Sequence, residues 1–385
     1  MATDNNNKVL NVPNLRFPEF TEVWKDSNIG KCFDLYSGNT PSRMEKKHFI
    51  GDVNWITSGE LKEHYIGDTK ERISEKAAED NNLRILPVGT FVMAIYGLEA
   101  EGVRGTCSIT VKTSTISQAC MAFTPKSNVS NEFLYSWYKK HGNKIGIRYA
   151  QGTKQQNLSY DIIEKFPIRY PSIEEQEKLN TFISLLDKRI ATQNKIIEKL
   201  ESLIKGIYDK TFANFSKYLA LSSICKIQKG QQVNGEEFSE FGEYYVMNGG
   251  IEPSGYYDKY NTMPNTISIS EGGNSCGYIQ FNTVPFWSGG HCYTLQGIST
   301  EYNTHFVYHY LKSKEKEIMA LRIGSGLPNI QKKDLEKYLI PVLSLETQKS
   351  IVNGINKIET KLKHEKDILS AYQTQKAYLL RNLFI

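Results

Sequence analysis

The two halves of this 385-residue chain repeat each other. When residue n is set beside residue n + 172, residues 157–212 fall on residues 329–384 without a gap, and ten of these 56 positions are identical. Unrelated sequences share far fewer positions, so the repetition indicates two copies of one structural unit. Numbered in the first copy, the identical positions are Asn157, Glu164, Lys165, Ile168, Ser172, Glu174, Gln176, Ile183, Ile196 and Phe212.

Upstream of residue 157 the two copies diverge in length as well as in sequence. Ser37-Gly38 corresponds best to Lys229-Gly230, and Cys120 corresponds to Cys292. The interval from the glycine to the cysteine is 82 residues in the first copy and 62 in the second. Each copy therefore combines a variable part with a scaffold part that has kept its register.

The scaffold part of each copy is predicted to be a long helix. Ser172-Ile-Glu-Glu175 is a capping box, and the 40 residues that follow contain no proline and one glycine, Gly206. Apolar residues recur at alternating spacings of three and four, which is a heptad seam. The seam consists of Ile183, Leu186, Ile190, Ile197 and Leu200 in the first copy and of Ile355, Ile358, Leu362 and Leu369 in the second.

The charged outer faces of these helices leave only the narrow seam to be buried. We expect the two helices, each roughly 60 Å long, to form an intramolecular antiparallel coiled coil that also offers surface to partners. An ordinary buried helix in a bundle is the alternative. Gln193 and Glu365 interrupt the seam at equivalent positions, and such polar residues commonly fix the register of a helix pair.

The variable parts mix strand-like and helical segments, which predicts two α+β domains, each with a twisted sheet. Residues 90–96 and 266–270 are expected strands followed by glycine-containing turns. Helices are expected near 131–140 and 303–321, with Asn131 and Asn303 as N-caps. The expected divisions are an N-terminal segment 1–14, a first domain 15–171, a spacer helix 172–215, a second domain 216–343 and a second spacer helix 344–385.

Polar loops punctuate both domains, and 151–158 pairs with 323–330 in the repeat. Base edges are read by Arg, Lys, Asn, Gln, Ser and Thr, and phosphates are bound by Lys, Arg and backbone N–H groups. The same residue types also form ordinary turns. The candidate DNA-binding residues in and beside these loops are Asn39, Thr40, Ser42, Arg43, Tyr96, Arg104, Lys154, Gln155, Gln156, Lys229, Gln231, Gln232, Asn234, Asn248, Asn274, Ser325 and Asn329.

The motifs that would indicate catalysis are missing from the sequence. It has no G-x-x-x-x-G-K-[ST] phosphate loop, no Asn-Pro-Pro-aromatic tetrapeptide and no Pro-Asp dipeptide. Residues 273–277 match G-x-S-x-G, but a strand-like segment follows where a nucleophile elbow needs a helix, so a hairpin turn is expected. His305 and His309 lack the glutamate of H-E-x-x-H and are expected to be packed or exposed. We predict no catalytic residue and no metal site.

The composition, 39% hydrophobic and 23% charged, is that of a soluble globular protein of two or three domains. No stretch approaches the roughly 18 apolar residues of a membrane span, and the polar first residues do not resemble a signal peptide, so we expect a cytoplasmic protein without a membrane partner. Six widely spaced cysteines are expected to be reduced and mostly buried. The net charge of +5 permits a nucleic-acid partner without requiring one.

The ordered motifs resemble the specificity subunits of type I restriction–modification enzymes. The opening Pro13-Asn-Leu-Arg-Phe-Pro-Glu-Phe20, then Trp24, Ile29-Gly30 and Gly38-Asn-Thr-Pro-Ser42, resembles the start of that family. Asn157-Leu158 and Asn329-Ile330, each followed by Ser-[Ile/Leu]-Glu-x-Gln and a long helix, resemble its conserved regions. Each motif alone is weak, but their duplicated order is specific and covers nearly the whole chain.

The resemblance implies a non-catalytic subunit that binds double-stranded DNA. Each variable domain would read one half of a bipartite, asymmetric site, and the helices would hold the domains more than one duplex turn, about 34 Å, apart. Two methyltransferase subunits would dock on the helices, and two restriction subunits would join them. S-adenosylmethionine, ATP and Mg²⁺ would be bound by those partners and not by this chain.

Three other functions remain as alternatives: a stand-alone DNA-binding regulator, a coiled-coil adaptor, and a self-contained methyltransferase or nuclease. The regulator would not need long charged helices, and the adaptor would not need two divergent domains rich in loops. The enzyme would need the motifs that the sequence lacks.

Overall fold

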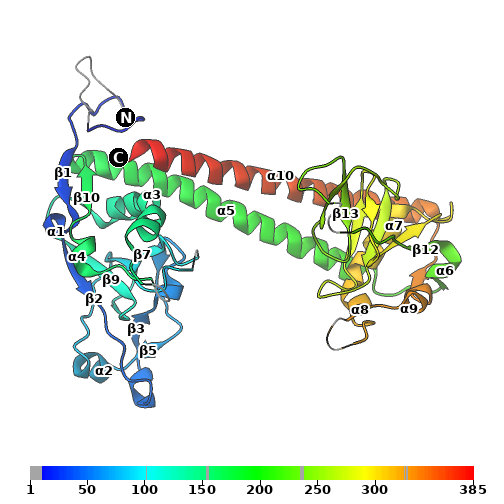
Figure 1. The fold of residues 1–385 in the computed structure, drawn as a ribbon, viewed down its shortest axis with the longest axis horizontal. Coiled ribbons are helices and arrows are strands. Elements are labelled where there is room, and N and C mark those ends of the chain that lie inside the picture. Colours follow the sequence, from blue (N-terminus) through cyan, green and yellow to red (C-terminus); the bar gives the residue numbers. More distant parts are fainter. Residues whose placement is uncertain (1–10, 101, 153–155, 235–237, 325, 327) are drawn as a thin grey trace. The chain divides into compact units, whose positions relative to one another are not determined.

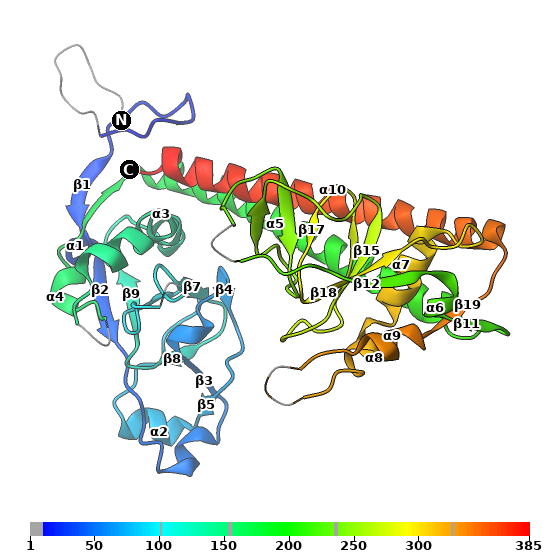
Figure 2. The same cartoon turned by 45° about the vertical axis from the view of Figure 1, so that its right-hand side comes forward.

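The computed structural model describes residues 11–100, 102–152, 156–234, 238–324, 326 and 328–385 (Figures 1 and 2). Three candidate DNA-binding residues, Lys154, Gln155 and Ser325, lie outside these residues. Contacts divide the chain into two compact units. Unit 1 comprises Met1–Thr192 and Leu369–Ile385, and unit 2 comprises Gln193–Ile368.

Two helices of 39 residues each, α5 (Ile173–Thr211) and α10 (Leu345–Leu383), confirm the predicted long helices. The start of α5 and the end of α10 belong to unit 1, and the remainder of each helix belongs to unit 2. Within unit 2, Gln193 Nε2 lies 3.0 Å from the backbone oxygen of Glu365, and Tyr208 Oη lies 3.3 Å from Glu359 Oε1. Residue numbers rise along one helix as they fall along the other, so the helices run antiparallel there.

The predicted seam residues face inward. Ile183, Leu186, Ile197 and Ile355 are buried, and Ile190, Leu200, Ile358, Leu362 and Leu369 are half-buried. Gln193 is also buried, and its amide donates to both the backbone oxygen and the carboxylate of Glu365. The burial of these residues agrees with the predicted seam, and these contacts are consistent with the predicted coiled coil.

The main sheet of unit 1 has five strands. Their order is β2 (Phe33–Ser37), β9 (Cys120–Pro125), β6 (Phe91–Ala94), β7 (Cys107–Thr110) and β4 (Tyr65–Ile66). A second sheet has the order β5 (Arg72–Ile73), β3 (Val53–Ile56) and β8 (Ser114–Ile116). The remaining elements are the paired strands β1 (Lys25–Asn28) and β10 (Pro167–Tyr170), helices α1 (Ile29–Cys32), α2 (Glu75–Asp80), α3 (Asn131–Tyr149) and α4 (Tyr160–Ile163), and 3-10 turns at Lys46–Phe49 and Ser58–Glu60.

Unit 2 repeats this topology with one strand fewer in its main sheet. The order is β12 (Lys226–Lys229), β18 (Cys292–Gln296), β15 (Thr266–Ser270) and β16 (Ile279–Asn282). Its second sheet has the order β14 (Gly255–Tyr257), β13 (Tyr244–Met247) and β17 (Trp287–Ser288). The remaining elements are the paired strands β11 (Tyr218–Ala220) and β19 (Leu339–Pro341) and helices α6 (Leu221–Ile224), α7 (Thr304–Ser313), α8 (Glu315–Met319) and α9 (Lys332–Glu336).

Both α+β domains and the predicted strand 266–270 are thereby confirmed, and the strand predicted at 90–96 is present as the shorter β6. In both second sheets the central strand pairs in parallel with a later strand, β3 with β8 and β13 with β17. The predicted helix 303–321 is divided at Lys314 into α7 and α8.

Each core contains the end of the long helix from the other copy of the repeat. In unit 1, Phe384, which directly follows α10, packs on Phe133 of α3, with ring centroids 5.4 Å apart. In unit 2, Phe212 packs on Phe306 of α7 at 5.9 Å. All four rings are buried, so the Phe212/Phe384 identity in the repeat reflects one packing position used twice.

Gln176 and Gln348, another identical pair, make the same three hydrogen bonds. Gln176 Oε1 accepts from Ser130 N, and its Nε2 donates to the backbone oxygens of Asn128 and Pro171. Gln348 Oε1 accepts from Asn303 N, and its Nε2 donates to the backbone oxygens of residues 301 and 343. Gln176 thus links the start of α3 to the start of α5, and Gln348 links the start of α7 to the start of α10.

These contacts correct one prediction. Ser130, and not Asn131, is the N-cap of α3, because its hydroxyl accepts from Phe133 N at 3.2 Å. The Asn131 side chain donates instead to the backbone oxygen of Gly89. Asn303 caps α7 as predicted, so the two helices are related by an offset of 173 residues, one more than the scaffold.

The predicted capping box at the start of α5 is only half formed. Ser172 Oγ accepts from Glu175 N at 3.4 Å. The Glu175 side chain is 2% exposed and is engaged elsewhere, by two hydrogen bonds from Arg16 and one from Trp24 Nε1. A buried carboxylate needs such partners, and they explain why Arg16 and Trp24 belong to the opening motif.

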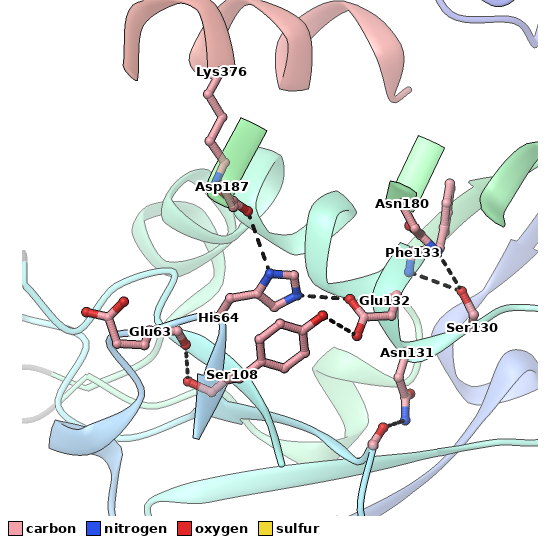
Figure 3. Close-up of polar contacts among 12 residues, drawn as sticks. Glu63, His64, Ser108, Ser130, Asn131, Glu132, Phe133, Asn180, Asp187 and Lys376 are labelled. Atoms are coloured by element: carbon pink, nitrogen blue, oxygen red, sulfur yellow. Dashed lines mark hydrogen bonds and ion pairs between the residues drawn. The ribbon is translucent and has the colours of Figure 1, made fainter. Parts of the chain in front are cut away.

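Strand β4 has no counterpart among the described residues of unit 2, and a charged network lies beside it. His64 lies between Glu132 of α3 and Asp187 of α5, and Asp187 also pairs with Lys376 of α10 (Figure 3). The imidazole Nε2 is 2.9 Å from Glu132 Oε2, and Nδ1 is 3.6 Å from Asp187 Oδ2. The longer first variable part is thus joined to both long helices.

The Gln348→Ala substitution should lower the free energy of unfolding of unit 2 by roughly 2 kcal/mol, because three hydrogen bonds to a fully buried side chain are lost. Urea denaturation followed by circular dichroism measures the change. Gln373→Ala on the exposed face of α10 is the matched control. Equal effects of the two substitutions would contradict the assigned role.

The network around His64 should make stability depend on pH. Burial opposes the charged imidazole, but the hydrogen bonds to Asp187 and Glu132 outweigh burial and raise the pKa of His64. The charged form therefore stabilises the fold fully below the unfolded pKa of about 6.5, and this contribution is lost as pH rises through the folded pKa.

Wild-type protein should accordingly lose thermal stability relative to His64→Gln as pH is raised from about 6 to 9, since glutamine does not titrate. Melting temperatures of both proteins across this range test the expectation. If the two melting temperatures changed in parallel with pH, folding would not raise the pKa of His64.

Candidate nucleic-acid interface

The variable loops of each unit gather at one edge of its main sheet. In unit 1, β2 and β6 end at this edge and β9 begins there, and Ile95 N donates to Ala119 O at 2.9 Å. In unit 2, β12 and β15 end there and β18 begins, and Glu271 N donates to His291 O at 2.9 Å. We call these places the reading edges of units 1 and 2.

Two glycines begin equivalent loops at the reading edges. A Cβ atom on Gly38 would lie 2.0 Å from the backbone oxygen of Ile116, and one on Gly230 would lie 2.2 Å from that of Gly289. Only glycine fits this close approach of two backbones. Gly38 N and Gly230 N donate to the backbone oxygens of Cys120 and Cys292, so the correspondences inferred from the sequence are confirmed.

The ends of the loops 151–157 and 323–329 are joined in the same way. Reciprocal backbone hydrogen bonds close the first between Gln151 and Asn157 and the second between Ile323 and Asn329. Isolated bridges then join Asn157 to Tyr96 and Asn329 to Gly272, each just beyond a strand of the main sheet. The pairing of these loops in the repeat is confirmed, and Asn329 is exposed.

Several candidate residues of unit 1 lie on the loops that begin or end at its reading edge. Asn39 Nδ2 donates to the backbone oxygen of Asn81, and Asn39 Oδ1 accepts from Thr40 N. Gln156 N donates to Glu99 Oε2 at 2.9 Å. Tyr96 helps to line a hollow of about 520 Å³ between the strand ends and the loop that begins at Gln151.

Other candidates of unit 1 are engaged elsewhere. Arg43 makes a two-pronged ion pair with Glu71, with Nη2 to Oε2 at 2.8 Å, and its guanidinium lies 4.5 Å from the ring centroid of Phe49. The neighbouring Ser42 is exposed. The Arg104 side chain lies against α3 at Gly146, where a Cβ would be 3.0 Å from its Cγ.

In unit 2 the candidates Lys229 and Asn248 surround two residues that the sequence did not identify, Glu271 and His291. Lys229 Nζ is 2.6 Å from Glu271 Oε1. His291 Nδ1 is 3.6 Å from Glu271 Oε2, and His291 N donates to Asn248 Oδ1. These residues are far apart in the chain, so only the strand register, and no local motif, could have found them.

The remaining candidates of unit 2 lie on its loops. The backbone oxygen of Gln231 accepts from Trp287 Nε1, as that of Asn39 accepts from Trp55 Nε1 in unit 1. Gln232 Nε2 donates to the backbone oxygen of Val233. Asn234 and Asn274 are exposed. Binding of DNA by any of these residues remains a prediction.

Residues 273–277 and the two histidines lie as the sequence indicated. Residues 273–277 connect the antiparallel strands β15 and β16, which confirms the hairpin. His305 stacks on Phe281 at 4.2 Å. His309 is buried between Tyr208 Oη and Asn356 Oδ1, and burial lowers its pKa to about 4.

The described part of the chain contains no group of three potential metal ligands and no helix long and apolar enough to cross a membrane. All six cysteines are free and buried, as the sequence indicated.

The chain resembles known proteins both in sequence and in fold. The specificity subunit of the type I restriction enzyme MjaIX from Methanocaldococcus jannaschii is 24% identical over 417 aligned residues, which cover 96% of this chain and 94% of that protein. The specificity subunit of EcoR124I/EcoR124II from Escherichia coli is 25% identical over 189 residues, which cover 48% of this chain and 45% of that protein.

The S subunit of a type I restriction–modification system from M. genitalium has a similar crystal structure, with a TM-score of 0.66 and 20% identity over 97% of this chain and 99% of that one. At this identity the likeness shows the fold alone. A family model described as the type I restriction modification DNA specificity domain matches residues 21–202 and 216–371. Both copies of the repeat are matched, and the chain therefore belongs to the specificity-subunit family of type I restriction–modification systems.

Proposed function

We propose that this chain reads a bipartite, asymmetric site on double-stranded DNA, with each unit contacting one half-site. One observation carries the proposal: two units with the same strand order gather polar loops at the same sheet edge, whereas these loops differ in length and chemistry. Because the loops lie at equivalent positions, both units could contact bases in the same way, and because the loops differ, the two units would read different base sequences.

In this proposal α5 and α10 set the distance between the half-sites. A continuous helix of 39 residues is about 58 Å long, which exceeds one duplex turn of about 34 Å. The base pairs between the half-sites would go unread.

The helices also suit the docking of two methyltransferase subunits. Outside the seam, Leu185 and Leu203 of α5 and Ile368 and Tyr378 of α10 are 41–56% exposed. In this proposal these apolar side chains, accessible along both helices, would contact the methyltransferase subunits. Two restriction subunits would complete the complex, and S-adenosylmethionine, ATP and Mg²⁺ would be bound by those partners.

The proposal is tested by co-purifying the chain with candidate methyltransferase subunits and selecting from a randomised duplex library. A split motif, with two different half-sites and a fixed unread gap, is the expected result. A single uninterrupted motif would favour a stand-alone regulator, and the absence of sequence preference would favour an adaptor.

The affinity for a selected site should also depend on salt. Log affinity should fall linearly with log salt concentration, by a slope of about 0.9 for each phosphate neutralised. Several phosphates are expected, so affinity measured between 50 and 200 mM salt by fluorescence anisotropy should fall at least tenfold. An affinity that does not change with salt would argue against backbone contacts by the basic loop residues.

A further inference from the structure

The reading edges of the two units differ at three equivalent positions. Ser37 corresponds to Lys229, because each precedes the glycine that begins the first loop. Ile95 corresponds to Glu271 and Ala119 to His291, because Ile95 N to Ala119 O and Glu271 N to His291 O are the same hydrogen bond in the two units. The backbone oxygens of Ile95 and Glu271 also accept equivalent bonds, from residues 158 and 330.

In unit 2 these positions hold a charged cluster built around Glu271, whose side chain is 12% exposed. Its Oε1 accepts from Lys229 Nζ at 2.6 Å and from Tyr293 Oη at 3.0 Å. Its Oε2 is buried without a hydrogen bond and faces His291 Nδ1 at 3.6 Å. The side chains of Lys229 and His291 are 51% and 62% exposed, so the carboxylate is covered while the two bases face outward.

In unit 1 the three equivalent positions, Ser37, Ile95 and Ala119, carry no charged side chain. Ser37 and Ile95 border the hollow described above, together with Tyr96 and Asn157. Tyr96 stands where unit 2 has Gly272. The two units therefore differ at these three positions, which form a charged cluster in unit 2 and carry uncharged side chains in unit 1.

We propose that Lys229, positioned by Glu271, recognises a guanine in the half-site read by unit 2, and that unit 1 makes no such contact. This inference rests on the proposed function. A lysine donates to the O6 and N7 acceptors of guanine in the major groove. Glu271 is a positioning residue, since a side chain held before binding loses less conformational freedom when it binds.

The carboxylate also favours a base over a phosphate as the target of Lys229. A phosphate contact gains its energy from net positive charge, and the Lys229–Glu271 pair is neutral. The negative carboxylate next to the lysine would repel the phosphate groups of the DNA backbone. A base edge carries no net charge, so the same pair approaches it without that repulsion.

The test uses the complex of the full chain with its methyltransferase subunits and the randomised duplex library. Lys229→Gln should reduce the preference for guanine at one position of one half-site by at least about fivefold and leave the other half-site unchanged. Lys229→Arg should keep the preference, since arginine also reads guanine. Lys226→Gln, which removes the same charge from the opposite end of β12, should change nothing in the motif.

Glu271→Gln separates positioning from a merely structural role. Loss of the negative charge should raise affinity for random duplex, and freeing Lys229 should weaken the guanine preference. A structural role alone would lower both, which would overturn the proposal. The proposal would also be overturned if Lys229→Gln lowered the affinity for all duplexes equally and left the selected motif unchanged. If wild-type protein selects no split motif, the proposed function itself fails, which is a different result.

Discussion

The structure depends on the burial of a narrow apolar seam that neither long helix can cover alone. A helix with one apolar stripe and charged outer faces gains little stability in isolation. In unit 2 the pairing of α5 with α10 is seen in the contacts of Gln193 with Glu365 and of Tyr208 with Glu359. The ends of the helices then enter domain cores, where Phe384 meets Phe133 and Phe212 meets Phe306. Each unit thus needs both helices, and the repeat has kept these positions.

The division of each copy into a scaffold and variable loops explains where the two copies differ. Scaffold identities such as Gln176/Gln348 and Phe212/Phe384 make the same contacts in both units. The strand order is also shared, and the loops at the reading edges are not. Ser37, Ile95 and Ala119 occupy the places of Lys229, Glu271 and His291, so one backbone frame presents two surfaces of different chemistry.

The repeat, the two helices and their seam could be predicted from the sequence, because helical periodicity is local and the scaffold has kept its register. One local prediction, the cap at Asn131, was wrong, and another, the capping box at Ser172–Glu175, was only half right, both for tertiary reasons. Gln176 and the backbone of Gly89 set the cap of α3 at Ser130, and Arg16 with Trp24 engages Glu175. The cluster of Lys229, Glu271 and His291 could not be predicted, since it depends on pairing between strands that are distant in the chain.

The account is tested most directly by changing the length of the helices. Seven residues that continue the heptad would be inserted into α5 after Gln193 and into α10 after Glu365, which lengthens the helix pair by roughly 10 Å. The account predicts that the selected motif keeps both half-sites and that its gap grows by about three base pairs, at about 3.4 Å each. An unchanged gap, or altered half-site sequences, would contradict it.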